Sequence, residues 1–221
     1  MATRRETIGW IAGSGFFLSG CNVGGSASYH FRMTVEVETP AGLKTGSAIY
    51  KVLAEKNNTR LLAEERAGGT VTRGEAVTVD LPGGPLFILL KLPEGNDSLG
   101  AVATFALSPD TRRGDIDAYM SAVRSLGGLF GGAKAELPRA DWPMMVRFTD
   151  IRDPKSIEGV DPDAIGVKRI VVETTDDALT TGIEKKIPWL PRIYQMGIGP
   201  DFRPAGIPLG DFKRLFSTEV R

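Results

Sequence analysis

The stretch YHFRMTVEVE, Tyr29 to Glu38, alternates apolar and polar side chains without a break. Successive side chains of a β-strand point to opposite faces of a sheet, so this period of two predicts a strand with one buried face. Thr39 to Gly42 contains proline and glycine, which favour turns, and Lys44 to Leu53 is rich in β-branched and aromatic residues. We therefore expect an antiparallel hairpin from Tyr29 to Leu53.

Further strands are expected along the chain. They are predicted at Gly74 to Leu81, Leu86 to Leu90, Leu99 to Leu107, Met144 to Asp150 and Val167 to Thr174. The stretch Leu86 to Leu90 is apolar throughout, which is typical of a strand that is buried on both faces.

One helix is clearly indicated. Asp115 can cap it, apolar residues at helical spacing run from Ile116 to Leu126, and Gly127-Gly128 end it. Short helices are expected within Asp177 to Lys186 and around Asp211 to Phe216. The fold class is therefore mainly β, with α+β as the alternative: an antiparallel β-sandwich-like domain with one clear helix and one or two short ones.

Two stretches are expected to lack long regular elements. Lys56 to Arg66 is polar and reads as a loop or one helical turn. Gly197 to Gly210 is crowded with glycine and proline, which favours an extended surface segment.

The composition excludes several classes of function. The chain of 221 residues has 27 basic and 27 acidic residues, so it lacks the basic excess of a nucleic-acid-binding protein. One cysteine and one histidine make an internal disulfide and a structural zinc site improbable. We expect no cofactor and no nucleic-acid partner.

The amino terminus has the order of a secretory signal. Arg4-Arg5 precede an uncharged stretch from Thr7 to Gly20, and the only cysteine, Cys21, follows directly. The apolar part is too short to span a bilayer, which takes about 20 apolar residues. The competing interpretation is that Ile11 to Leu18 is a buried strand and Cys21 a small core residue.

The four residues Leu18-Ser19-Gly20-Cys21 resemble the lipobox of bacterial lipoproteins. The resemblance implies cleavage before Cys21, lipidation of its thiol and new amino group, and a membrane anchor. In that family an aspartate after the cysteine commonly signals retention in the inner membrane, so Asn22 favours the outer membrane. As a whole the chain is similar to uncharacterised lipoproteins of Gram-negative bacteria, a likeness that supplies no activity.

These signals divide the chain into three parts. Residues 1–20 are the predicted signal peptide, residues 21–28 the lipidated cysteine and a flexible tether, and residues 29–221 a single β-rich globular domain with a Gly/Pro-rich C-terminal segment.

Candidate sites are few. An acidic loop contains four candidate metal ligands, Asp150, Asp153, Asp161 and Asp163, because carboxylates in irregular loops suit Ca²⁺. Aspartates beside prolines are equally expected at turns and helix caps. Any catalytic triad would have to use His30, which lies on the polar face of the first predicted strand. We assign no catalytic residue.

Aromatic residues gather in the proline-rich second half of the chain. Trp142, Trp189, Tyr194 and Phe202 can line a carbohydrate or peptide groove, or close the edge of a core.

The sequence favours a membrane-anchored cell-envelope lipoprotein that faces the periplasm and acts as a non-catalytic binding or structural module, with an envelope protein or a glycan as partner. The alternative is an anchored carboxylate-dependent hydrolase or carbohydrate-active enzyme, which requires two acids about 5 to 10 Å apart in a pocket. A third hypothesis is a small-ligand or metal-binding module around Asp150 to Asp163.

Overall fold

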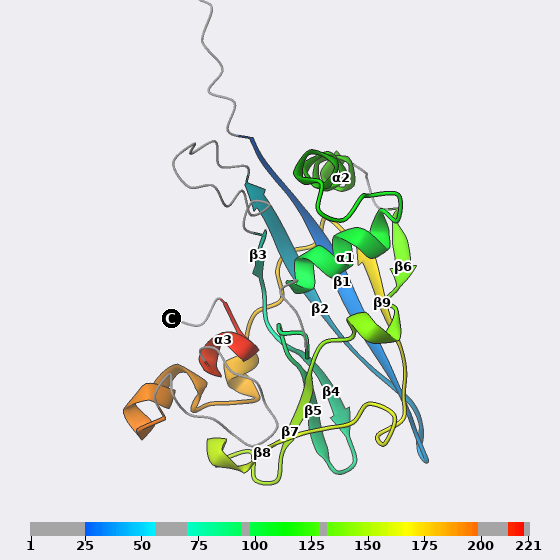
Figure 1. The fold of residues 1–221 in the computed structure, drawn as a ribbon. Helices are drawn as coiled ribbons and strands as arrows, with labels where there is room; N and C mark the ends of the chain where they lie inside the picture. Colours follow the sequence, from blue (N-terminus) through cyan, green and yellow to red (C-terminus); the bar gives the residue numbers. More distant parts are fainter. Residues whose placement is uncertain (1–24, 56–69, 94–97, 129–131, 199–211, 219–221) are drawn as a thin grey trace, which may run out of the picture.

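The computed structural model describes residues 25–55, 70–93, 98–128, 132–198 and 212–218, and the protein is mainly β over these ranges (Figure 1). The strands are β1 (Ser26–Thr39), β2 (Gly42–Glu55), β3 (Thr70–Arg73), β4 (Val77–Leu81), β5 (Gly84–Ile88), β6 (Lys134–Glu136), β7 (Met145–Phe148), β8 (Ile157–Gly159) and β9 (Val167–Thr174). The helices are α1 (Leu99–Leu107), α2 (Ile116–Gly128) and α3 (Phe212–Phe216), with short 3-10 helices η1 (Arg139–Asp141), η2 (Pro154–Ser156), η3 (Ile183–Lys185) and η4 (Leu190–Met196).

The strands form two antiparallel sheets. The first sheet has the order β3-β2-β1-β9-β6, and the second has the order β4-β5-β7-β8. The expected fold class, a β-rich sandwich-like domain, is confirmed.

The predicted first hairpin is confirmed and is longer than expected. The apolar residues of β1 are all buried and its polar residues lie on the opposite face, as the alternation predicted. The strand already begins at Ser26, where Ser26, Ala27 and Ser28 pair with Glu55, Ala54 and Leu53. The last three residues of the predicted tether therefore belong to the sheet, because Ala27 continues its buried face.

The second sheet packs on the inner face of the first. Between β3 and β4 the chain changes sheets at Gly74, whose φ of +145° suits glycine. Further along, β4 crosses β2 so closely that a Cβ on Gly46 would lie 2.2 Å from the carbonyl oxygen of Thr78. Two glycines thus allow the sheets to meet.

The helices α1 and α2 cover the rest of the same inner face. Figure 1 shows them across one half of the first sheet, with β4 and β5 over the other half. The predicted helix α2 is confirmed, and Asp115 caps it by accepting hydrogen bonds from the amides of Asp117 and Ala118 at 3.0 Å each.

The strand predicted at Leu99 to Leu107 was wrong, because this segment is the helix α1. The Ser98 side chain caps its start by accepting from the amide of Ala101. The segment is apolar on almost every side and lies buried beside β9, β3 and α2. Hydrophobic periodicity cannot distinguish such a short buried helix from a buried strand.

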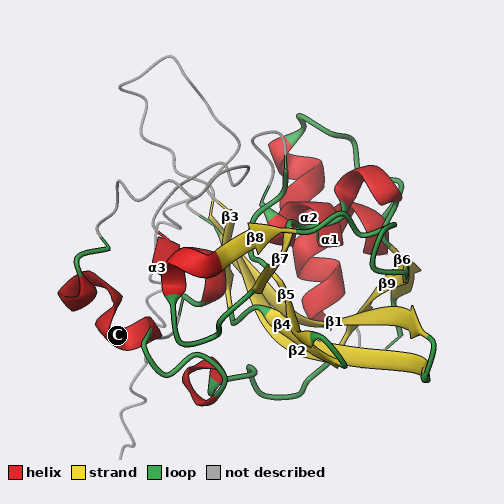
Figure 2. Ribbon diagram, turned by 90° about the horizontal axis from the view of Figure 1, so that it is seen from below, coloured by secondary structure: helices red, strands yellow, loops and turns green. Residues whose placement is uncertain are grey.

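The second sheet is covered on both faces, so the molecule has three layers (Figure 2). Leu86 and Ile88 face the first sheet, whereas Phe87 and Leu89 belong to a second core formed with the C-terminal segments. The prediction that Leu86 to Leu90 is buried on both faces is thereby confirmed for residues 86–89.

The C-terminal part of the described chain forms the third layer. The predicted helix around Asp211 to Phe216 is present as α3, and the one expected within Asp177 to Lys186 is the single turn η3. The leader with Cys21, the stretch Lys56 to Arg66 and most of Gly197 to Gly210 lie outside the described residues. Within the described ranges, none of the helices has the length and apolar character that crossing a membrane requires.

Candidate functional site

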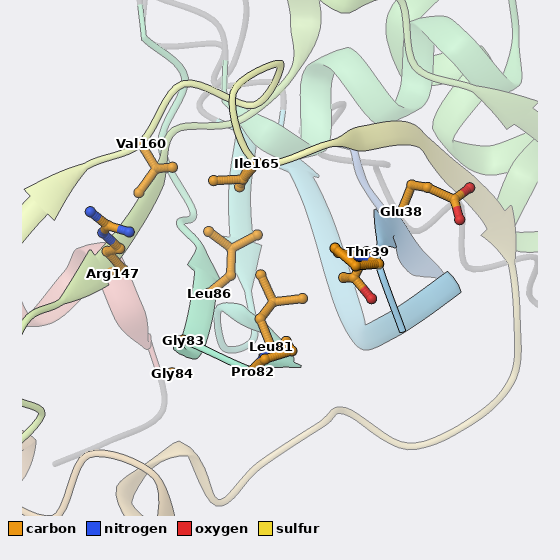
Figure 3. Close-up of a pocket in the computed structure, with 11 residues that line it drawn as sticks. Glu38, Thr39, Leu81, Pro82, Gly83, Gly84, Leu86, Arg147, Val160 and Ile165 are labelled. Atoms are coloured by element: carbon orange, nitrogen blue, oxygen red, sulfur yellow. The ribbon is translucent and has the colours of Figure 1, made fainter. Parts of the chain in front are cut away.

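A cavity of about 280 Å³ opens at the end of the sandwich where two hairpin turns and a loop meet (Figure 3). The β1–β2 turn supplies one side, the β4–β5 turn a second side, and the loop between β8 and β9 the third. The lining residues are Glu38, Thr39, Pro40, Leu81, Pro82, Gly83, Gly84, Leu86, Arg147, Val160 and Ile165. We call this cavity the turn pocket.

Local backbone geometry brings the three segments together. Gly84 and Gly166 have φ values of +109° and +77°, a region that favours glycine. The amide of Glu38 donates to the carbonyl of Gly166 at 2.8 Å, which ties the β8–β9 loop to the end of β1. A Cβ on Gly166 would lie 2.7 Å from the Glu38 carbonyl oxygen, so this contact requires a glycine.

The turn pocket has an apolar floor with a charged residue on each side. In Figure 3 the side chains of Leu86 and Ile165 lie between Arg147 and Glu38, and the Glu38 carboxylate points away from them. Arg147 is half exposed and pairs with Glu158 at 3.3 Å. Such a site can bind a small apolar or amphipathic group.

The lining offers little for catalysis. Among the described residues that line it, Glu38 is the one with a carboxylate, and none is a histidine, cysteine or serine. A glycosidase needs a second acid across the bond that is cleaved. The residues that the structure describes in this lining thus do not supply the pair of acids that such an enzyme uses.

The structure does not bring the four candidate metal ligands together. Asp153 caps η2 by accepting from the Lys155 amide at 2.9 Å, and Asp161 accepts from the Asp163 amide at 3.0 Å. Over the described ranges, no three His, Cys, Asp or Glu residues are placed to hold a metal ion.

Arginines also engage these aspartates. The guanidinium of Arg152 hydrogen-bonds to Asp150 at 3.0 Å and lowers the pKa of that carboxyl. Arg139 lies 3.2 Å from Asp163 and 3.7 Å from Asp161. In the structure these four aspartates act in turns, caps and surface ion pairs.

His30 lies on the polar face of β1, as the alternation of the sequence predicted. Its Nδ1 is 3.0 Å from the carbonyl oxygen of Asp177, in a segment that follows β9 along the outer face of the first sheet. It is not part of the turn pocket.

Two further hollows adjoin the predicted aromatic residues. Trp189 lines one of about 580 Å³ together with Arg152, Lys186 and Arg192. Trp142 lines another of about 500 Å³, in which the guanidinium of Arg139 lies 4.6 Å from its ring centre.

The indole groups themselves are mostly part of the cores. Trp142 and Trp189 are both buried, and each donates its Nε1 hydrogen to a backbone carbonyl. Tyr194 is exposed, and Phe202 lies outside the described residues. These tryptophans therefore close core edges, as the second of the two interpretations expected.

Sequence reasoning missed the turn pocket because its residues come from four strands, two turns and a loop that are far apart in the sequence. The only local signals were the turn residues at Pro40 and Pro82, which do not reveal that the two turns lie side by side.

Comparison with known proteins finds no match: neither a family model, nor a curated protein, nor a solved structure matches the chain.

Proposed function

We propose that the protein is a membrane-anchored cell-envelope lipoprotein whose β-rich domain binds a partner without catalysis. The single observation that carries the proposal is the lipobox Leu18-Ser19-Gly20-Cys21, which precedes the first strand of the domain by only a few residues. Lipidation at Cys21 would hold the domain at a membrane surface, with the outer membrane favoured and the domain in the periplasm.

The position of the turn pocket supports a binding role. The chain enters the domain at Ser26, the start of β1, and the pocket lies at the other end of this strand beside Thr39. A strand of 14 residues is roughly 40 Å long. A domain anchored near Ser26 therefore presents the turn pocket away from the membrane, where an envelope protein or a glycan can reach it.

The free energy of inserting the acyl chains into a bilayer is large enough to hold the domain at a membrane. Each buried methylene of an acyl chain contributes about 0.8 kcal/mol, and a single chain gives only marginal attachment. The several chains that a lipobox directs would hold the domain firmly.

Metabolic labelling tests the anchor. Cells of a Gram-negative host that express the full chain are fed labelled palmitate, and the wild type is expected to incorporate it. The Cys21→Ala variant should lose the label, because it lacks the acceptor sulfur. The matched control Ser19→Ala keeps a small residue at its lipobox position and should be labelled like the wild type.

Two results would overturn the proposal. One is equal labelling of the wild type and Cys21→Ala. The other is an intact leader with an unmodified thiol, found by mass spectrometry of the wild type purified from those cells.

A further inference from the structure

The side chains of β7 point alternately to the two faces of the second sheet. Val146 and Phe148 belong to the second core, which the sheet forms with the C-terminal segments. Arg147 therefore lies on the opposite face, the one toward the first sheet, where Leu86 also points. This alternation brings a guanidinium to one side of the apolar floor of the turn pocket (Figure 3).

The Arg147 guanidinium is the one cationic group among the described residues that line the turn pocket. Its Nε and Nη2 donate to the same oxygen of Glu158, at 3.4 and 3.3 Å, and both side chains are about half exposed. A long, exposed ion pair contributes little to stability and can yield to another carboxylate. The hydrogens on Nη1 bond to no described residue, so the guanidinium keeps donors for a second anion.

Two more polar side chains line the turn pocket, and neither offers a partner to a ligand on the floor. The Thr39 hydroxyl donates to the carbonyl of Gly42 at 2.7 Å and accepts from the amide of Ala41 at 3.2 Å. The Glu38 carboxylate points away from the floor (Figure 3), so it does not oppose an anion there. A sugar or a peptide backbone inside the pocket would lose hydrogen bonds to water and find few new ones. These contacts favour a ligand with an apolar body and one anionic end.

We propose that the turn pocket binds a free medium-chain fatty acid, with its hydrocarbon chain on the apolar floor and its carboxylate on Arg147. The apolar side chains of the lining are Pro40, Leu81, Pro82, Leu86, Val160 and Ile165. A cavity of about 150 Å³ holds benzene, so the turn pocket, at about 280 Å³, has room for a chain of about ten carbon atoms. The inference rests on the binding role proposed for the turn pocket and not on the lipid anchor.

Isothermal titration calorimetry tests both ends of the ligand. The full chain with Cys21→Ala, which cannot be lipidated at residue 21, is titrated at neutral pH with sodium decanoate below its micelle concentration. One decanoate should bind per chain, and shortening the ligand to octanoate and hexanoate should weaken binding about fourfold for each methylene removed. The uncharged 1-decanol, which has the same chain, should bind at least tenfold more weakly than decanoate.

Substitutions on β7 and β8 test the contact with the carboxylate. Arg147→Gln should weaken decanoate binding at least tenfold and leave 1-decanol nearly unchanged, because only the charged end loses its partner. Arg169→Gln is the matched control: the Arg169 side chain is 51% exposed and also pairs with a glutamate, Glu36, but it lies on β9 outside the lining. Glu158→Gln removes the competing carboxylate and should bind decanoate at least as tightly as the parent chain. All three positions are solvent-accessible, so far-UV circular dichroism should show an unchanged fold.

Four results would overturn the inference. They are no saturable binding of decanoate at millimolar concentration, equal affinity for decanoate and 1-decanol, the same loss in Arg147→Gln and Arg169→Gln, and weaker binding by Glu158→Gln. None of them bears on the anchor, which the palmitate labelling tests separately.

Discussion

At the scale of single residues, Glu75 is a carboxyl group held away from water where three segments meet. It is 2% exposed, its Oε2 accepts from the amide of Ile183 at 2.8 Å, and Ser217 lies 3.4 Å from its Oε1. It also pairs with Ser217 through the backbone. This one side chain therefore joins the start of β4 to η3 and to the end of α3.

Burial of Glu75 has a consequence for stability. Desolvation raises the pKa of this carboxyl above its ordinary value of 4.5, since burial penalises the charged form more than the protonated form. The folded protein then binds this proton more tightly than the unfolded chain does. The contribution of Glu75 to stability is full below pH 4.5 and is lost as the pH rises through the elevated folded pKa.

The variant Glu75→Gln tests this effect. Glutamine keeps a carbonyl oxygen for the Ile183 amide but carries no charge at any pH. The difference in unfolding free energy, variant minus wild type, should increase with pH above 4.5 by about 1.4 kcal/mol for each unit by which the pKa is raised. Urea unfolding of both proteins between pH 4 and pH 8 measures it. A difference that does not change with pH would refute the argument.

At the scale of elements, buried hydroxyl groups fix α1 on the first sheet. Thr104 in α1 donates to the carbonyl of Gly100 at 2.7 Å, so the Tyr29 hydroxyl, 2.9 Å away on β1, is the donor to Thr104. Both residues are buried, and burial raises the pKa of the Tyr29 phenol. A helix that is apolar on nearly all sides has no polar stripe to orient it, so this contact sets how it lies on the sheet.

The variant Thr104→Val should destabilise the protein by about 1–3 kcal/mol, because it leaves the Tyr29 hydroxyl buried without a partner. Removing that hydroxyl as well, in Tyr29→Phe with Thr104→Val, should recover a large part of the loss. Denaturant unfolding of the two single variants and the double variant gives the coupling. If the losses of the single variants simply add, the hydroxyl contact does not stabilise the docking of α1.

The same elements show what could be predicted from the sequence. The strands β1 and β9 were predictable because one of their faces meets a core and the other meets water. The helix α1 was not, because a segment buried on all sides has no polar face to mark its period. The turn pocket could not be predicted either, because Glu38, Leu86 and Ile165 come together only through the packing of two sheets.

At the scale of the whole molecule, the second sheet is the layer that both cores share. One of its faces packs on the first sheet, and its other face packs on the C-terminal segments through Phe87, Phe148 and Phe216, whose rings lie 5.7 to 5.9 Å apart. The strands β4 and β5 are thus packed from both sides. The turn that joins them supplies one wall of the turn pocket, at the end of β1 opposite to the proposed anchor.

A preformed apolar pocket with an arginine in its lining should bind a small amphipathic anion. We expect 8-anilinonaphthalene-1-sulfonate to bind the full chain with Cys21→Ala saturably, with its ring system on the apolar floor and its sulfonate near Arg147. Ile165→Trp fills the pocket from its half-buried rim and should weaken binding at least tenfold. Ile151→Trp is the matched control, because Ile151 is also half-buried but lines the hollow beside Trp189. Fluorescence titration measures both variants, and an equal loss in the two, or none in Ile165→Trp, would show that the dye binds elsewhere and that the turn pocket is not the binding site.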